Sequence, residues 1–206
     1  MMIGLAGAHR TGKTTLARRF SEVSGYSFLE TKVSAVFEQH GLSPREHYPT
    51  ETRLWIQRKT LDKMVEVYSS HRSFAVVDRT PIDLAAYMLA DITRAEIAPE
   101  IDQQVIKYVD DCIAVAREFF SAIVIVQPGI KIVDEPGKAP PIESYIEHLN
   151  AICLGLINSN NIGPASAYSI SRSCTELDER CEALISIAAN LPMPSNVIPY
   201  QQKTPM

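Results

Sequence analysis

One eight-residue segment constrains the fold of this 206-residue chain more than any other. It fits the pattern G-x-x-x-x-G-K-[S/T] without a gap, as Gly7, Ala8, His9, Arg10, Thr11, Gly12, Lys13 and Thr14. A run that is apolar on both faces, Met2–Ala6, comes before it, and a stretch of helical composition, Thr11–Phe20, follows. A glycine-rich turn between a buried strand and a helix is the phosphate-binding loop of nucleoside-triphosphate-binding proteins. The segment therefore predicts an α/β fold with a phosphate site.

The residue types of this phosphate-binding loop (P-loop, residues 7–14) match the chemistry of a triphosphate. The glycines let backbone N–H groups turn inward around phosphate oxygens, and the helix N-terminus adds partial positive charge. Lys13 is expected to neutralise the β- and γ-phosphates, and the Thr14 hydroxyl to bind Mg²⁺. We therefore expect ATP and Mg²⁺ as cofactors, with residues 7–14 and the adjoining Thr15 in contact with the nucleotide.

Short apolar runs alternate with longer helical patterns along the rest of the chain, which is typical of a parallel sheet covered by helices. Strands are expected at residues 2–6, 27–30, 74–77, 122–126 and 167–170, and helices at residues 11–20, 50–68, 81–92, 101–119, 142–156 and 177–185. These elements predict a three-layer α/β/α P-loop domain with a five-stranded parallel sheet over residues 1–190. A loop rich in Pro and Gly, residues 128–142, is a candidate lid, and residues 191–206 form a Pro-rich tail.

The composition of the chain limits the kinds of partner that it is expected to bind. The net charge of −4 gives no basic bias toward nucleic acid or a membrane surface. The four cysteines are far apart and have no metal-like spacing, which is typical of reduced core residues in a cytoplasmic protein. The N-terminus does not resemble a signal peptide, and no apolar run approaches the roughly 20 residues that span a bilayer.

A second motif follows the predicted strand at 74–77, where Asp78 precedes Arg79-Thr80-Pro81. A carboxylate at this strand end is a candidate Mg²⁺ ligand, directly or through water. The arginine beside it is suited to hold an acceptor or the phosphoryl group in transfer. Together with Gly7–Thr14, this motif resembles the P-loop nucleoside and nucleotide kinases: the thymidylate kinases, the deoxynucleoside kinases and the nicotinamide-riboside-kinase-like ATPases. The resemblance covers about the first 95 residues well and the remainder only in its order of elements.

The resemblance implies roles for further residues. Lys13, Asp78 and Arg79 would be catalytic, and Glu30 would accept the proton of the attacking hydroxyl. Gln57 would read a base edge, and Arg53 and Asp83 would also belong to the acceptor site. Arg172 would contact adenine. Trp55 and Tyr87 are candidates to stack on a base.

The candidate lid departs from the family pattern. Thymidylate and adenylate kinases usually carry several arginines there, whereas this chain has only Lys131 and Lys138 between Pro128 and Ile142. Either a lysine replaces them, or an arginine such as Arg172 or Arg117 comes from elsewhere.

Other P-loop classes fit worse. No N-K-x-D guanine-reading sequence of a GTPase is present, an ABC-type ATPase needs its serine-glycine signature, and a helicase or a full AAA module needs a longer chain. The sequence thus predicts an ATP-dependent kinase of a nucleoside, nucleotide or related acceptor, either monomeric or homodimeric.

Two alternatives stay open. The first is a phage kinase of 5-hydroxymethyluracil within DNA, acting in the host cytoplasm, with a local groove formed by Arg53, Arg58, Lys59 and Lys63. The second is a non-catalytic or regulatory ATP-binding module.

Overall fold

A five-stranded, all-parallel sheet forms the centre of the computed structural model, which describes residues 1–43, 46–92, 97–133, 141–159 and 166–192. The strands follow one another in the sheet as β2-β3-β1-β4-β5. Their bounds are β1 Met2–Ala6, β2 Ser27–Glu30, β3 Ala75–Asp78, β4 Ala122–Val126 and β5 Ser166–Ile170. The predicted five-stranded α/β fold is confirmed.

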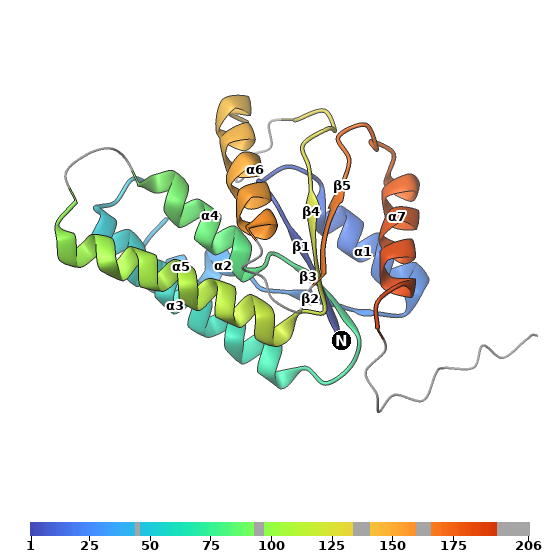
Figure 1. Cartoon of the computed structure of the whole chain (residues 1–206), viewed down its shortest axis with the longest axis horizontal. Helices are drawn as coiled ribbons and strands as arrows, with labels where there is room; N and C mark the ends of the chain where they lie inside the picture. Colours follow the sequence, from blue (N-terminus) through green and yellow to red (C-terminus); the bar gives the residue numbers. More distant parts are fainter. Residues whose placement is uncertain (44–45, 93–96, 134–140, 160–165, 193–206) are drawn as a thin grey trace, which may run out of the picture.

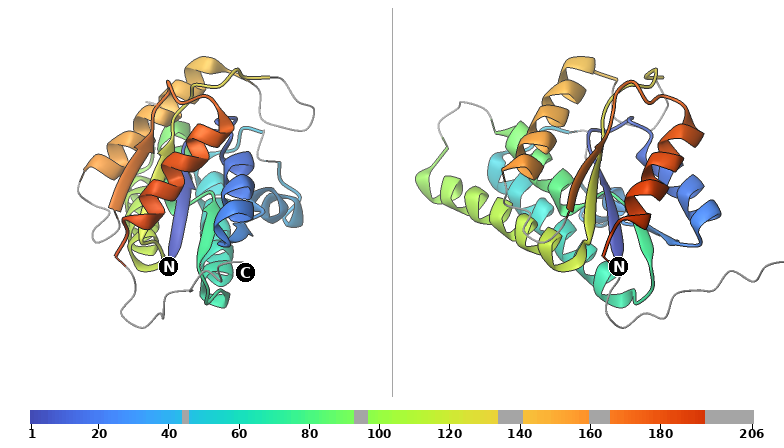
Figure 2. Two further views of the ribbon diagram at one scale, coloured as in Figure 1. Left: turned by 90° about the vertical axis from the view of Figure 1, so that its right-hand side faces the viewer. Right: turned by 45° about the vertical axis from the view of Figure 1, so that its right-hand side comes forward.

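Helices cover both faces of the sheet (Figures 1 and 2). Helices α1 and α7 lie side by side on one face, while α3, α4, α5 and α6 cover the other. The helix bounds are α1 Lys13–Ser24, α2 Val33–Gln39, α3 Thr50–Ser70, α4 Pro81–Asp91, α5 Pro99–Phe119, α6 Glu143–Asn158 and α7 Leu177–Ala189.

The central strands are apolar on both sides because each side faces a helical layer. Ile3 and Leu5 of β1 pack in one hydrophobic cluster with Leu16 and Phe20 of α1. The larger cluster on the opposite face joins the sheet to α3–α6. Burial on two faces explains why these strands read as continuous hydrophobic runs in the sequence.

Helix α2 is the one described helix that the sequence did not predict. It has only seven residues, begins after Lys32 in a left-handed conformation (φ 45°), and has no side-chain cap. Val36 and Phe37 bury its inner face against Ile56 of α3. A helix this short depends on tertiary packing rather than on local propensity, so it leaves little periodic signal.

The sheet order brings the functional motifs together. The strand β1 lies between β3 and β4, and the register pairs Leu5 with Asp78 and Glu30 with Asp78. The P-loop, Asp78 and Glu30 therefore share the carboxyl edge of the sheet, where open α/β folds bind ligands.

Parts of two predicted segments lie outside the described residues: 134–140 of the candidate lid and 193–206 of the tail. Among the helices that the structure describes, none is both long enough and apolar enough to cross a membrane.

Candidate active site

The P-loop backbone makes a turn that depends on glycine. Gly7 and Gly12 have φ values of 130° and 82°, and Arg10 also lies at positive φ (62°). A Cβ at Gly7 would stand 2.8 Å from the carbonyl oxygen of Val126, so a side chain there would strike the neighbouring β4 backbone. The turn therefore requires glycine for both conformation and space.

The Lys13 side chain folds back into the P-loop. Its Nζ donates to the carbonyl oxygens of Gly7 at 2.8 Å and Ala8 at 2.5 Å. Burial lowers the pKa of Lys13, while the carboxylate of Asp83 opposes that shift. The ammonium group is thus held in the loop where a triphosphate would bind.

The lowered pKa of Lys13 predicts that ATP affinity falls at alkaline pH. Bound phosphates favour the protonated lysine, so affinity is lost as pH rises through the lowered pKa, below the ordinary value of 10.5. Titration calorimetry with ATP between about pH 7 and pH 10 measures this loss. A Lys13→Arg variant that still binds ATP should not show it, because arginine stays charged throughout. A flat profile for the wild type would contradict the expectation.

Thr14 and Asp78 form the candidate Mg²⁺ site. The Thr14 hydroxyl donates a hydrogen bond to Oδ2 of Asp78, which joins the start of α1 to the end of β3. A hydroxyl and a carboxylate are hard oxygen ligands, and Mg²⁺ in phosphate sites commonly has one or two protein ligands, with phosphates and water completing the shell. The residues present therefore fit the ion.

Asp83 lies behind the P-loop. Its side chain is fully buried, Oδ1 accepts from the Gly7 N–H at 3.0 Å, and Oδ2 accepts from the N–H and hydroxyl of Thr80 at 2.7 and 2.9 Å. Asp83 was expected in the acceptor site, but all of these contacts are with the protein. The carboxylate closes a capping box on α4 and ties that helix to the loop.

We predict that Asp83→Asn lowers the free energy of unfolding by about 1–3 kcal/mol, because an amide has one acceptor oxygen for three donors. Urea unfolding measures the loss, and ATP affinity should fall with it. Asp110→Asn is the matched control, since Asp110 is exposed on α5. Equal unfolding midpoints for Asp83→Asn and the wild type would contradict this role.

Arg79 adopts an unusual backbone conformation at the end of β3. Its φ is 74°, a left-handed value that is uncommon for a residue other than glycine. The backbone is held there by a bond from its N–H to Leu5 and by one from the Tyr68 hydroxyl to its carbonyl. The guanidinium lies 5.8 Å from the ring centre of Tyr87. Strained residues of this kind concentrate at functional sites.

A network of aromatic and charged side chains continues from the P-loop. His9 Nδ1 lies 3.1 Å from the Tyr87 hydroxyl, and the His9 ring also neighbours Tyr145 of α6. The Tyr145 hydroxyl donates to Asp91, which pairs with Arg53 of α3 at 2.9 Å. This network was not foreseen, because its members come from the P-loop, α3, α4 and α6, and no sequence spacing links them.

Gln57 lies one turn after Arg53 on α3. It is 4% exposed, and its Oε1 has no hydrogen-bond partner among the described residues. A buried acceptor without a partner is costly, which makes Gln57 a candidate to accept from a donor that the described residues do not supply. Trp55, in contrast, is 45% exposed and packs edge-on against His40.

Glu30 is at the same sheet edge as Asp78. Its side chain is 46% exposed, and Oε2 lies 3.9 Å from a guanidinium nitrogen of Arg18. An exposed pair at this distance is weak, which leaves the carboxylate accessible.

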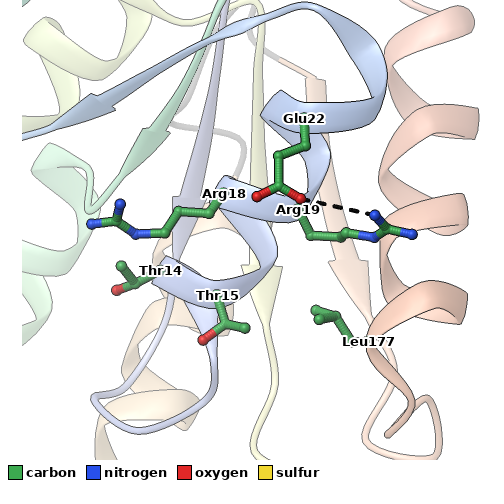
Figure 3. Close-up of a pocket in the computed structure, with 6 residues that line it drawn as sticks. All are labelled: Thr14, Thr15, Arg18, Arg19, Glu22 and Leu177. Carbon is green, nitrogen blue, oxygen red and sulfur yellow. Dashed lines mark ion pairs between the residues drawn. The ribbon is translucent and has the colours of Figure 1, made fainter.

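A small cavity of about 290 Å³ adjoins the loop on the side of α7. It is lined by Thr14, Thr15, Arg18, Arg19, Glu22 and Leu177 (Figure 3). Arg18 and Arg19 extend to opposite sides of α1, and Arg19 pairs with Glu22. The cavity places Thr15 at a surface that a nucleotide bound in the P-loop could reach.

Arg172, which was considered as a replacement for the lid arginines, and Arg10 differ in their position relative to the candidate lid. Arg172 forms a two-pronged pair with Glu147 at 2.5 and 2.6 Å, at an exposed site after β5. Arg10 lies in the P-loop itself and donates to the carbonyl oxygen of Val133, within the candidate lid. Lys138 falls outside the described residues. A lid contact therefore comes from a P-loop arginine that the sequence analysis assigned only to ATP binding.

Three of the four basic residues predicted to form a DNA groove on α3 make ion pairs, whereas the fourth, Lys59, is exposed. Arg53 pairs with Asp91, Arg58 with Asp111, and Lys63 with Glu66. These carboxylates lower the net positive charge of this helix face, and the DNA groove stays a prediction.

Comparison with known proteins agrees with this geometry. Residues 2–121 match a family model described as "AAA domain". The chain was expected to be too short for a full AAA module, so the sequence analysis did not anticipate this match. A search of curated proteins found no match.

Several solved structures share the fold. Deoxyadenosine kinase from M. mycoides with bound dCTP has a TM-score of 0.63 and 14% identity, covering 93% of this chain and 100% of that chain. Thymidylate kinase from Ehrlichia chaffeensis has a TM-score of 0.56 and 14% identity, over 91% and 98%. NadR protein in complex with NR has a TM-score of 0.65 and 15% identity over 97% of this chain, which spans only 54% of that one.

These likenesses confirm the P-loop kinase fold that the motifs Gly7–Thr14 and Asp78–Pro81 had suggested. The family match covers more than half of the chain and includes both motifs. The chain belongs to the AAA domain family of P-loop proteins.

Proposed function

We propose that this protein is an ATP-dependent kinase that phosphorylates a hydroxyl group of a nucleoside-like acceptor. The observation that carries the proposal is the arrangement at the sheet edge, where Lys13, the Thr14–Asp78 pair and Arg79 adjoin one another. This set can bind a triphosphate on one side and hold a transferring phosphoryl group on the other. The solved neighbours named as deoxyadenosine and thymidylate kinases support the same activity.

The side chains beyond Arg79 favour a neutral acceptor. The nearest cation of α3, Arg53, is already paired with Asp91, whereas Gln57 offers an unpaired amide oxygen. An amide suits the N–H groups of a base, and aromatic rings such as Tyr87 and Tyr145 suit its faces. An additional acceptor phosphate would need a further free cation.

The reaction requires few covalent steps from the protein. Glu30 accepts the proton of the acceptor hydroxyl, whose oxygen forms a bond to the γ-phosphorus as the bond from that phosphorus to the β–γ bridging oxygen breaks. The products are ADP and a phosphate monoester. Lys13 and Arg79 stabilise the negative charge that shifts to the phosphate oxygens. Mg²⁺, held by Thr14 and Asp78, would neutralise further phosphate charge.

The decisive experiment is a transfer assay with γ-labelled ATP. The acceptors are nucleosides, nucleoside monophosphates and duplex DNA that contains 5-hydroxymethyluracil. We expect label on one or more nucleosides. Label only on monophosphates or on DNA would overturn the acceptor assignment. Slow ATP hydrolysis that no acceptor accelerates would instead indicate a regulatory module.

A further inference from the structure

Arg180 reaches the P-loop from the opposite end of the chain. It lies in the first turn of α7 and is only 3% exposed. Helix α7 packs beside α1 (Figure 2). Its Nη2 donates to the carbonyl oxygen of Thr11 at 2.8 Å. A Cβ built at Gly12 would stand 2.9 Å from its Nη1, so the guanidinium lies directly against the left-handed part of the loop.

The charge of this guanidinium has no counter-ion in the part of the chain that the structure describes. Within the described residues, no carboxylate forms an ion pair with Arg180, and its buried Nε has no hydrogen-bond partner. Burial lowers the pKa of Arg180, although arginine remains charged. Burying an unpaired charge costs several kcal/mol, so a fold that retains one needs compensation from elsewhere.

The position of Arg180 indicates the source of that compensation. It hydrogen-bonds the residue before Gly12, whose φ of 82° shapes the turn around the phosphates. Unit charges interact strongly across a few ångströms of protein, where water does not screen them. A triphosphate in the P-loop would bring a negative charge that none of the described carboxylates supplies.

We propose that Arg180 is a positioning residue for ATP, holding the Thr11–Gly12 turn and adding a positive charge that the nucleotide phosphates balance. This inference rests on the proposed function, because it requires ATP to occupy the P-loop. It assigns α7, which lies outside the family match at residues 2–121, a direct part in nucleotide binding.

The test compares Arg180→Met, Arg180→Lys and a control, Arg72→Met, which removes an exposed arginine before β3. Calorimetry gives the Kd for ATP with Mg²⁺, and thermal unfolding gives the Tm without nucleotide. Arg180→Met should raise the Kd about tenfold or more, since the positive charge that the nucleotide phosphates balance is lost. Its Tm should stay the same or rise, because an unpaired buried charge is replaced by an apolar side chain. Arg180→Lys should keep the Kd within about threefold of the wild type, because the charge is retained.

Three results would overturn the proposal. An unchanged Kd for Arg180→Met would mean that the charge does not serve ATP binding. A raised Kd with a Tm lowered by several degrees would mean that Arg180 only supports the fold. An equal loss of ATP affinity in Arg180→Met and Arg180→Lys would mean that the positive charge itself has no role in binding. If the wild type itself has no affinity for ATP, the proposed function fails along with this inference, whereas the other outcomes leave the kinase proposal intact.

Discussion

Replacing Lys13 by alanine should lower kcat/KM for ATP by at least about 10²–10³-fold, the loss typical of removing one preorganised charge donor at a transition state. The Lys13 ammonium is buried in the P-loop and already held by the carbonyl oxygens of Gly7 and Ala8. Because it is held in the loop, the proposed function expects it to stabilise the developing phosphate charge with little reorganisation. The truncated side chain leaves neither charge nor donor. Steady-state kinetics with labelled ATP measure the loss of kcat/KM, and direct titration with ATP measures the loss of ATP affinity.

Lys107→Ala is the matched control for Lys13→Ala. Lys107 is exposed on α5 and, among the described residues, pairs with Asp111 alone, a contact expected to contribute less than about 1 kcal/mol. Its variant should keep both the activity and the ATP affinity of the wild type. If Lys13→Ala kept them too, the P-loop would not be the nucleotide site, and the kinase proposal would fail.

The fold was predictable because its signals are local. The runs at β1 and β4 are apolar on both faces, and the glycines of the P-loop are demanded by their own backbone angles. Each signal lies within a few consecutive residues. Only the short helix α2, which depends on packing against Ile56, lacked such a signal.

The roles of individual site residues were less predictable, because burial and partners decide them. Asp83 was expected in the acceptor site, yet its carboxylate accepts hydrogen bonds from Gly7 and Thr80. The spacing from Thr80 to Asp83 is that of a capping box, a local signal that could have indicated this structural role.

Contacts across the fold gave no sequence signal at all. Arg180 and Thr11 are 169 residues apart, and the pair formed by Arg53 and Asp91 joins two helices. A lone arginine in a helix reads as a solvated surface residue until the tertiary structure buries it. The sequence therefore identified the P-loop, whereas the contacts that surround it required the structure.

Glu30→Gln tests which kind of group receives the phosphate. Glu30 ends β2 in register with Asp78, and its carboxylate is accessible beside Arg18. A hydroxyl nucleophile must lose a proton, whereas an acceptor phosphate is already ionised. With a nucleoside acceptor we expect kcat to fall about 10²–10⁴-fold, the usual contribution of a general base. The Kd for ATP should be unchanged, because glutamine keeps the size of the side chain and lies outside the P-loop.

Glu38→Gln, an exposed change on the neighbouring helix α2, controls for the loss of one negative charge at this side of the molecule and should leave kcat unaltered. The ratio of the two variants' kcat values isolates proton transfer from a general electrostatic effect. If Glu30→Gln remained fully active on its best acceptor, a proton-accepting role for Glu30 would be excluded. A phosphate acceptor would then become the better explanation, because phosphoryl transfer to an ionised oxygen needs positioning and charge stabilisation but no base.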